Sequence, residues 1–231
     1  MTGVLRPLPA GGYDFITFDC YGTLIDWESG ITTAFIAEAA RNGATLDRDA
    51  IFEAYMHVEP EVESGPFAGY REVLTQTARE VASRLGWSLD PSRAYFLADS
   101  LASWQPFADT LPALKRLASR YRLGILSNVD DDLIASTLQH FSGVHFDLVV
   151  TAQQVNSYKP AYAHFEVARR RLGVARWLHA AQSYFHDVVP ATALKVPVVW
   201  VNRKEEALNA DGPQPTAQVR DLAGLADYLG V

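Results

Sequence analysis

The chain has 231 residues, of which 48% are hydrophobic and 20% are charged, and its formal net charge at pH 7 is −7. This composition is that of a globular protein, and the negative charge disfavours nucleic acid and anionic membranes as partners. One cysteine excludes an internal disulfide framework and a thiol-rich metal site. No apolar stretch reaches the ~18 residues that cross a bilayer, and residues 1–12 do not have the pattern of a secretory signal, so we expect a cytoplasmic protein.

The first predicted element is a buried strand over residues 15–18, and it runs directly into Asp19. This position is the carboxyl end of a strand, the edge where open α/β sheets bind their ligands. An aspartate there can act as a covalent nucleophile. Cys20 is a second candidate nucleophile, but alternation along the strand points it to the opposite face, which favours a buried packing role.

The segment from Trp27 to Trp104 contains only helical patterns. We expect helices at residues 31–42, 49–62, 70–85 and 92–103, separated by turns at clusters of Gly and Pro. This predicts an all-helical unit between the first strand and the second.

Further apolar, β-rich runs follow, separated by helical patterns. The strands are expected at residues 123–126, 146–150, 178–181 and 196–201, and the helices at residues 130–141, 161–172 and 216–229. Alternation of buried strands and helices predicts a doubly wound parallel sheet, that is, a Rossmann-like α/β core. We therefore predict a core domain of residues 1–26 and 105–231 that carries an inserted all-helical cap domain of residues 27–104.

Polar residues follow the later strands as well. Ser127 and Asn128 come directly after the second strand, where their side chains and free backbone N–H groups can hold an anion, although ordinary turns also favour this pair. Lys159 precedes Pro160, and because Pro favours the first helical position, we expect a helix to begin there. A solvated surface role is the alternative for this lysine.

Asp187 follows the fourth strand after a short loop. It is a candidate general base, and its alternative role is the N-cap of the next helix; the two roles are compatible. His186 beside it has the pKa of a base, but we interpret it as a structural neighbour.

Taken in order, residues 15–24, 126–128, 156–160 and 181–187 resemble the four motifs of the haloacid dehalogenase superfamily. In that superfamily the first aspartate, here Asp19, attacks the substrate, and a helical cap covers it. The resemblance is greatest to the type II 2-haloacid dehalogenases, whose leaving halide needs no proton.

Two acidic residues of the superfamily's phosphatases are replaced in this chain. Tyr21 stands where those enzymes have their acid/base aspartate, and Gln182 stands where a loop aspartate helps to bind magnesium. Asp19 and Asp187 alone make a poor site for an ion that prefers several hard anionic oxygens. We therefore predict no metal and no other cofactor.

The resemblance also implies roles for individual residues. Asp19 is the nucleophile and inverts the carbon that bears the halogen. Asp187 is the base that activates water against the resulting ester, and Lys159 orients it, keeps Asp19 ionised and attracts an anionic substrate. The implied substrate contacts are Tyr21, Thr23, Ser127, Asn128, Gln182 and Tyr184.

Other positions depart from that family. Its cap usually supplies an arginine that holds the halide, and here Arg41 or Arg71 would have to reach the cleft, or His57 or His186 would have to replace it. Phe165 stands where the family usually has a tyrosine, with Tyr162 close by. Aromatic residues in the loop before Asp187, such as Tyr184, are expected to narrow the pocket for a small substrate such as a haloacetate.

The leading hypothesis is therefore a hydrolase that converts short 2-haloalkanoic acids to 2-hydroxy acids through an aspartyl ester. The alternatives are a phosphatase-like hydrolase of the same superfamily and a catalytically silent protein that binds a small anion on this fold. The expected partner is a small anionic substrate, and the resemblance adds a possible homodimer.

Overall fold

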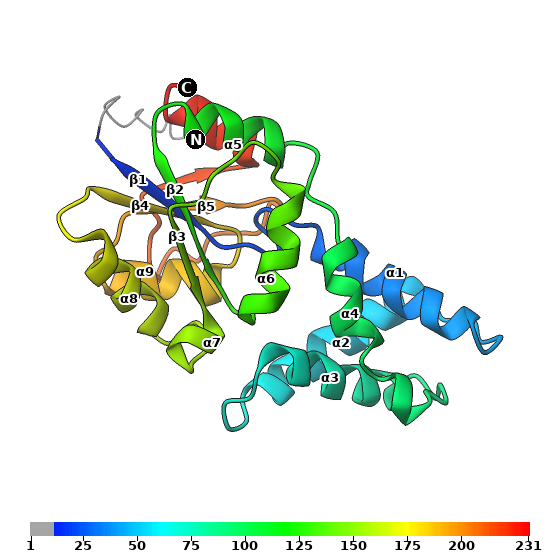
Figure 1. The fold of residues 1–231 in the computed structure, drawn as a ribbon. Coiled ribbons are helices and arrows are strands. Elements are labelled where there is room, and N and C mark those ends of the chain that lie inside the picture. Colours follow the sequence, from blue (N-terminus) through cyan, green and yellow to red (C-terminus); the bar gives the residue numbers. More distant parts are fainter. Residues whose placement is uncertain (1–11) are drawn as a thin grey trace.

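The computed structural model describes residues 12–231, and an all-parallel sheet with the strand order β3-β2-β1-β4-β5-β6 forms its centre. The strands are β1 (Phe15–Phe18), β2 (Arg122–Ser127), β3 (Leu148–Thr151), β4 (Trp177–Ala181), β5 (Val198–Val201) and β6 (Ala217–Val219). Neighbouring strands pair in parallel throughout, so their carboxyl ends meet at one edge of the sheet (Figure 1).

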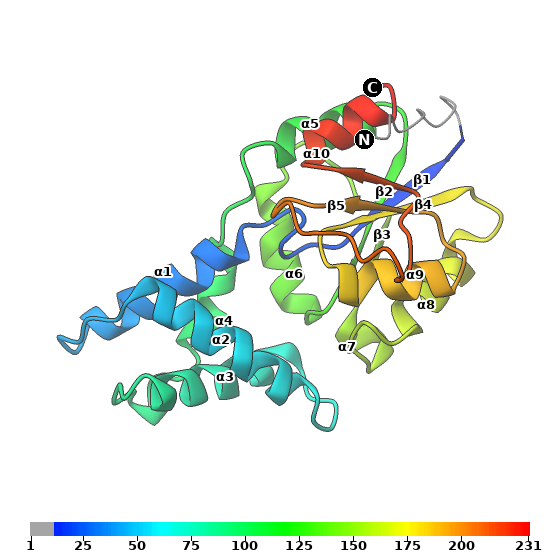
Figure 2. The same ribbon diagram turned by 180° about the vertical axis from the view of Figure 1, so that it is seen from behind.

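Helices cover both faces of this sheet, as the two opposite views show (Figures 1 and 2). The helices that follow Trp104 in the chain are α5 (Thr110–Ala118), α6 (Asp131–Thr137), α7 (Ala152–Val155), α8 (Ala163–Leu172), α9 (Val189–Ala193) and α10 (Leu222–Tyr228). Side chains of α5, α6 and α10 pack with Ile16 and Phe18 in one cluster, and those of α8 and α9 pack with Phe15 in another. Because both faces are covered, all of β1 is buried, which explains its continuous apolar sequence.

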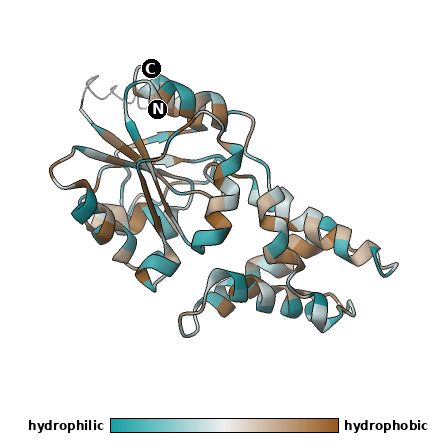
Figure 3. Ribbon diagram, viewed as in Figure 1, coloured by the Kyte–Doolittle hydropathy of each residue, from teal (hydrophilic) through white to brown (hydrophobic). Residues whose placement is uncertain are grey.

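A group of helices lies beside the sheet, beyond the end of β1 (Figure 1). It consists of α1 (Trp27–Ala40), α2 (Arg48–Glu63), α3 (Tyr70–Arg84) and α4 (Phe96–Ser100), with short 3-10 turns at Pro91–Arg93 and Leu101–Ser103. Asp26 and Asp47 cap α1 and α2, because their side chains accept hydrogen bonds from the backbone N–H groups of Ser29 and Ala50. Hydrophobic residues concentrate in the sheet and on the inner faces of the helices (Figure 3).

The predicted fold class is confirmed, and three local expectations are wrong. Residues 216–229 do not form one helix, because Ala217–Val219 adds a short edge strand before α10. Residues 92–103 form three short turns and helices instead of one helix. No helix begins at Pro160: α8 begins at Ala163, because Asn128 binds the backbone N–H and C=O of Lys159 and holds this segment in a turn.

The division into a core of residues 1–26 and 105–231 and a cap of residues 27–104 stays a prediction. Within residues 12–231 every helix is too short or too polar to traverse a lipid bilayer.

Candidate active site

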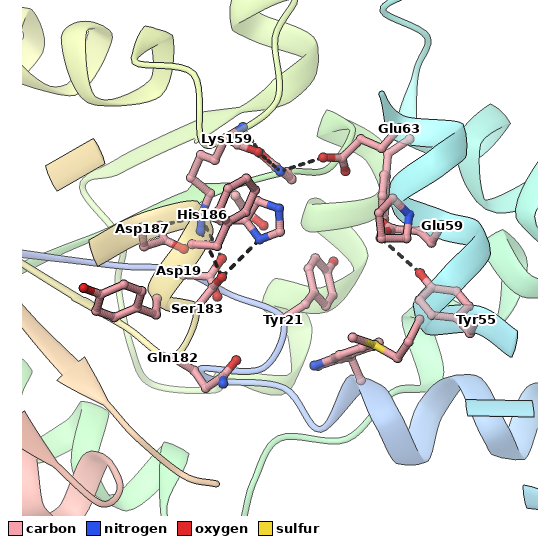
Figure 4. Close-up of a pocket in the computed structure, with 18 of the residues that line it drawn as sticks. Asp19, Tyr21, Tyr55, Glu59, Glu63, Lys159, Gln182, Ser183, His186 and Asp187 are labelled. Carbon is pink, nitrogen blue, oxygen red and sulfur yellow. Dashed lines mark hydrogen bonds and ion pairs between the residues drawn. The ribbon is translucent and has the colours of Figure 1, made fainter. Parts of the chain in front are cut away.

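Asp19 lies at the end of β1 with only 7% of its surface exposed. The turn that follows returns Thr23 to it, and the Thr23 hydroxyl donates a hydrogen bond to Oδ2 at 2.8 Å. The ammonium of Lys159 donates to the other oxygen, Oδ1, at 2.9 Å. The carboxylate is therefore held by two donors at the edge of the sheet, and Figure 4 shows Lys159 beside it. Cys20 is completely buried in the core, which confirms its packing role.

Lys159 joins the predicted catalytic residues into one buried cluster. Its Nζ donates to Asp19 Oδ1, to Asp187 Oδ1 at 2.7 Å and to the carbonyl oxygen of Leu126 at 3.0 Å. An ammonium has three N–H groups, so all of them are used. The side chain is 1% exposed, and the interpretation of Lys159 as a solvated surface residue is wrong.

A chain of buried side chains behind Asp187 fixes its orientation. Trp177 Nε1 donates to Thr17 Oγ1 at 2.7 Å, and this hydroxyl is 2.8 Å from His179 Nδ1. His179 Nε2 lies 3.0 Å from Asp187 Oδ1, and because a carboxylate only accepts, the proton of the imidazole is on Nε2. No role was predicted for His179 from the sequence, although a histidine inside an otherwise apolar strand could have indicated a buried polar contact.

The charges of this cluster shift its pKa values in different directions. For Asp187, burial alone would raise the pKa, but the charge of Lys159 and the hydrogen bond from His179 outweigh it and hold the pKa at about 2. For Lys159, burial alone would lower the pKa, but the two carboxylates outweigh it and raise it. Burial raises the pKa of Asp19, and the charge of Lys159 opposes this shift.

Ser127 and Asn128 lie where β2 ends, as their sequence position predicts. Ser127 is 1% exposed, and its Oγ has no hydrogen-bond partner among the described residues. Asn128 accepts from the backbone N–H of Lys159 at 2.7 Å and donates to its carbonyl oxygen at 3.0 Å. Asn128 therefore positions the lysine segment, while the Ser127 hydroxyl is free to meet a ligand.

A cavity of about 400 Å³ opens above Asp19, between the sheet edge and the helices α1, α2 and α3. Residues 19, 21, 127, 128, 159 and 182–187 line it from the core, and Trp27, Tyr55, Met56, Glu59, Pro60, Glu63, Tyr70 and Trp104 line it from the helical side. The other lining residues are Lys204 and Glu206. The volume is in the range that holds drug-sized ligands, so the aromatic residues do not restrict the cavity to a haloacetate.

The expected substrate contacts divide into two groups. Tyr21, Gln182 and Tyr184 line the cavity together with Ser127 and Asn128. Tyr21 donates to or accepts from Thr137 Oγ1 at 2.9 Å, and the Tyr184 hydroxyl donates to the Pro213 carbonyl at 2.5 Å. Thr23 is not among the lining residues: its hydroxyl bonds Asp19 and accepts the backbone N–H of Gln182.

The expected halide-binding arginine is not found among the residues that line the cavity. Arg71 pairs with Asp99 and Asp132 on the surface, and Arg41 is exposed beside Glu38. His57 is also exposed, and it contacts the backbone of its own helix. Of the suggested donors only His186 lines the cavity, where it lies 3.0 Å from Ser183 Oγ.

The residue that caps the turn after β4 is Ser183, whose side chain accepts the backbone N–H of His186. Asp187 lies inside the helical turn Tyr184–Val188, so its interpretation as an N-cap is wrong. The buried Oδ2 of Asp187 has no partner among the described residues, in contrast to its Oδ1.

The residues around Asp19 do not fit a magnesium ion. In residues 12–231, no three His, Cys, Asp or Glu side chains are grouped so that they could hold a metal. The ammonium of Lys159 already occupies the position between Asp19 and Asp187, within 2.9 Å of both. Magnesium requires several anionic oxygens in octahedral array, and this space supplies a cation instead.

Two carboxyl groups on α2, missed by the sequence analysis, face the cavity from the opposite side (Figure 4). Glu59 accepts a hydrogen bond from the Tyr70 hydroxyl at 3.1 Å, and Glu63 Oε1 lies 3.5 Å from the amide nitrogen of Asn128. Burial and the charge of Glu59 raise the pKa of Glu63 to about 8, and burial also raises that of Glu59. In the sequence, the four-residue spacing of Glu59 and Glu63 could have indicated that both lie on one face of a helix.

Comparison with known proteins identifies relatives over nearly the whole chain. A family model of haloacid dehalogenase-like hydrolases matches residues 13–189. An (S)-2-haloacid dehalogenase of Pseudomonas putida is 27% identical over 225 residues, covering 93% of this chain and 95% of the relative. A glyceraldehyde 3-phosphate phosphatase of Methanothermobacter thermautotrophicus is 34% identical over 106 residues, covering 42% of this chain and 45% of the relative. The crystal structure of a defluorinating L-2-haloacid dehalogenase superposes with a TM-score of 0.81 at 21% identity, covering 98% of this chain and all of the other, which shows a common fold.

Proposed function

Because this chain belongs to the haloacid dehalogenase-like hydrolases, we propose that it hydrolyses the carbon–halogen bond of 2-haloalkanoic acids through an aspartyl ester and without a metal. The observation that carries this proposal is the ammonium of Lys159 between Asp19 and Asp187, where it occupies the space that a metal ion would need. The similarity to (S)-2-haloacid dehalogenases over 93% of the chain supports it.

In the first step, an oxygen of Asp19 attacks the carbon that bears the halogen. The carbon–oxygen bond forms as the carbon–halogen bond breaks, and the halide leaves with the bonding electron pair. No proton is needed, which agrees with Tyr21 at the position of an acid: burial raises the pKa of its hydroxyl well above the usual value. The charge of Lys159 opposes the rise in the pKa of Asp19 that burial causes, and so favours the ionised carboxylate that attacks.

In the second step, water attacks the carbonyl carbon of the ester. The free Oδ2 of Asp187 accepts a proton from this water, while its Oδ1 stays bound to Lys159 and His179. Lys159 and Thr23 remain beside the former carboxylate of Asp19 and stabilise the oxyanion that forms there. Collapse of this intermediate breaks the bond between the acyl carbon and the alkoxide oxygen, and Asp187 returns its proton to that oxygen, so that the 2-hydroxy acid leaves. The carboxyl group of Asp19 then loses its proton to solvent and is restored as a carboxylate.

The similarity to a phosphatase over 106 residues favours a phosphatase-like hydrolysis as the second candidate. Tyr21 and the absence of a fitting magnesium site among residues 12–231 speak against it. A silent binding protein would not need a buried lysine between two carboxylates. A homodimer and a cytoplasmic location stay predictions.

Halide release from chloro-, bromo- and fluoro-substituted 2-alkanoic acids, with phosphate esters in parallel, tests the proposal. We expect halide release that a chelator does not reduce, and its loss in the folded Asp19→Asn variant. Phosphate release that depends on magnesium would establish the second candidate instead.

A further inference from the structure

The proposed chemistry leaves one wall of the cavity unused. Glu59 and Glu63 lie one turn apart on α2, and both are half-buried and line the cavity. Among residues 12–231 neither carboxyl group has an ion-pair partner; their contacts are the hydroxyl of Tyr70 and the amide of Asn128. Such a pair costs stability because desolvation and mutual repulsion both oppose the charged forms. A cationic ligand would offset this cost.

The cavity offers these carboxyl groups no cation of its own. Lys159 has all three N–H groups bound to Asp19, Asp187 and Leu126. The other amine that lines the cavity, Lys204, pairs with Glu28. The acidic side chains that line the cavity are Asp19, Glu59, Glu63, Asp187 and Glu206. An incoming cation would therefore meet two carboxyl groups that no side chain of the cavity pairs, at the wall formed by Glu59 and Glu63 (the α2 wall), and it would favour their charged forms.

Aromatic rings surround the same wall. The ring centroids of Trp27 and Tyr55 are 5.7 Å apart and their planes are inclined by 50°. The Tyr55 and Tyr70 hydroxyls lie 3.5 Å apart, and Tyr70 holds Glu59. The face of an aromatic ring attracts cations, and rings combined with carboxylates are a common way to bind an alkylammonium group.

We propose that the space bounded by Glu59, Glu63 and the rings of Trp27 and Tyr55 binds an ammonium group of the substrate. The inference rests on the proposed function: the substrate is then a 2-haloacid whose far end carries an amine or alkylammonium. Its carboxylate lies near the unpartnered Ser127 hydroxyl, and its ammonium lies against α2. An organic cation fits this wall better than a metal ion, because among residues 12–231 no third metal ligand accompanies the two glutamates.

Titration calorimetry with tetramethylammonium chloride tests the ammonium site without any halogenated substrate. This probe keeps its charge at every pH. We expect the wild-type protein to bind it, and the double variant Glu59→Gln/Glu63→Gln to bind it at least tenfold more weakly. Equal affinity of the two proteins, or no binding to the wild type at pH 9, would overturn the proposal.

Glu61→Gln is the matched control, because Glu61 lies on the same helix, is exposed and does not line the cavity. It removes one charge from α2 and should bind the probe as tightly as the wild type. Circular dichroism and the thermal midpoint establish that each variant is folded. An equal loss of affinity in Glu61→Gln would show a general charge effect and overturn the site.

A pair of substrates of nearly equal size then joins the inference to the chemistry. We expect kcat/KM for 4-amino-2-chlorobutanoate to exceed that for 2-chloropentanoate at least tenfold, and this preference to disappear in the double variant. A preference for the uncharged chain would overturn the inference while halide release still supports the proposed function. Tetramethylammonium binding without halide release from any haloacid would instead support the ammonium site and contradict the proposed function.

Discussion

Two walls of the same cavity carry carboxyl groups in opposite electrostatic settings. The core wall contains Asp19, Lys159 and Asp187, and the α2 wall contains Glu59 and Glu63. On the core wall, Asp187 lies against Lys159 and His179, and its pKa is held at about 2. On the α2 wall, Glu63 has only Glu59 and an amide nearby, and its pKa is raised to about 8. Burial raises the pKa of both carboxyl groups, so the opposite directions of the net shifts come from their neighbours.

This contrast separates two tasks. A buried cation between two carboxylates fixes charged groups in place, as a reaction centre requires. An acidic wall without its own cation leaves an interaction for the ligand to complete. Substitutions on each wall test this division.

Removal of the cation from the core wall should have the largest effect. Lys159→Met leaves two buried carboxylates without the cation that they share, which costs about 3–5 kcal/mol of unfolding free energy. Halide release should fall by about 10²–10³-fold, as when an enzyme loses one preorganised donor. Urea denaturation and ion chromatography measure the two effects. Lys204→Met, at the half-exposed Lys204, is the control, and an equal loss there would contradict a special role for the buried lysine.

Loss of His179 should weaken the same wall to a smaller degree. His179→Leu takes one donor from Asp187 and leaves the Thr17 hydroxyl without its acceptor, which costs about 1–3 kcal/mol. The pKa of Asp187 should rise, because the imidazole lowers it, so the acid limb of the pH–rate profile should move to higher pH. The exposed His145 gives the control His145→Leu. An unchanged acid limb would show that His179 only packs.

The raised pKa of Glu63 on the α2 wall should make the folded protein less stable as the pH rises, whereas the lowered pKa of Asp187 on the core wall has the opposite effect. The pKa of Glu63 is about 8 in the folded protein against an ordinary value of 4.5, so the folded state keeps a proton that the unfolded state has lost between these pH values. Wild-type stability should fall as the pH rises through this window. Glu63→Gln should therefore gain about 1–2 kcal/mol relative to the wild type between pH 5 and pH 9. Denaturant unfolding at the two pH values measures this gain, and a constant difference would contradict the raised pKa.

Binding of tetramethylammonium should strengthen as the pH rises through about 8, because Glu63 then gains its charge. The charged or titratable groups that face it are Glu59 and Tyr55 on α2, Tyr70 on α3, and Tyr158 and Lys159 beside Asn128. The pKa values of the three tyrosines are raised and that of Lys159 is raised too, so these groups keep their charge state near pH 8. We expect an increase of about three- to tenfold between pH 7 and pH 9, on the order of 1 kcal/mol. The increase should be smaller in Glu63→Gln, where only Glu59, whose pKa is raised as well, can still gain a charge.

Tyr21→Phe should have the smallest effect. The hydroxyl bonds Thr137 and its pKa is far above neutrality, so it supplies no proton to a leaving group. We expect kcat to change less than about threefold and stability to fall by about 0.5–1.5 kcal/mol. A loss of activity comparable to that of Lys159→Met would show that the leaving group requires an acid.

The amino-acid sequence was sufficient to predict the elements that position the nucleophile. Strand 15–18, the strand at 123–126 and the helix that ends before Gly173 all form, because buried parallel strands and amphipathic helices leave strong local patterns. The three residues of β6 were missed, since so short an edge strand has no periodicity. The helix expected at Pro160 was wrong, because a contact between residues 128 and 159 overrides a local preference.

The sequence by itself determined the parallel sheet, the helical insertion and the order of the polar residues that follow the strands. Only the tertiary structure decided which of these residues touch. It brought Lys159 between Asp19 and Asp187, placed His179 behind them, and turned Glu59 and Glu63 toward the cavity while Arg71 stayed on the surface. The physical reason is that secondary structure follows from neighbours along the chain, whereas the charge state of a buried carboxyl group depends on residues that are distant in sequence and adjacent in space.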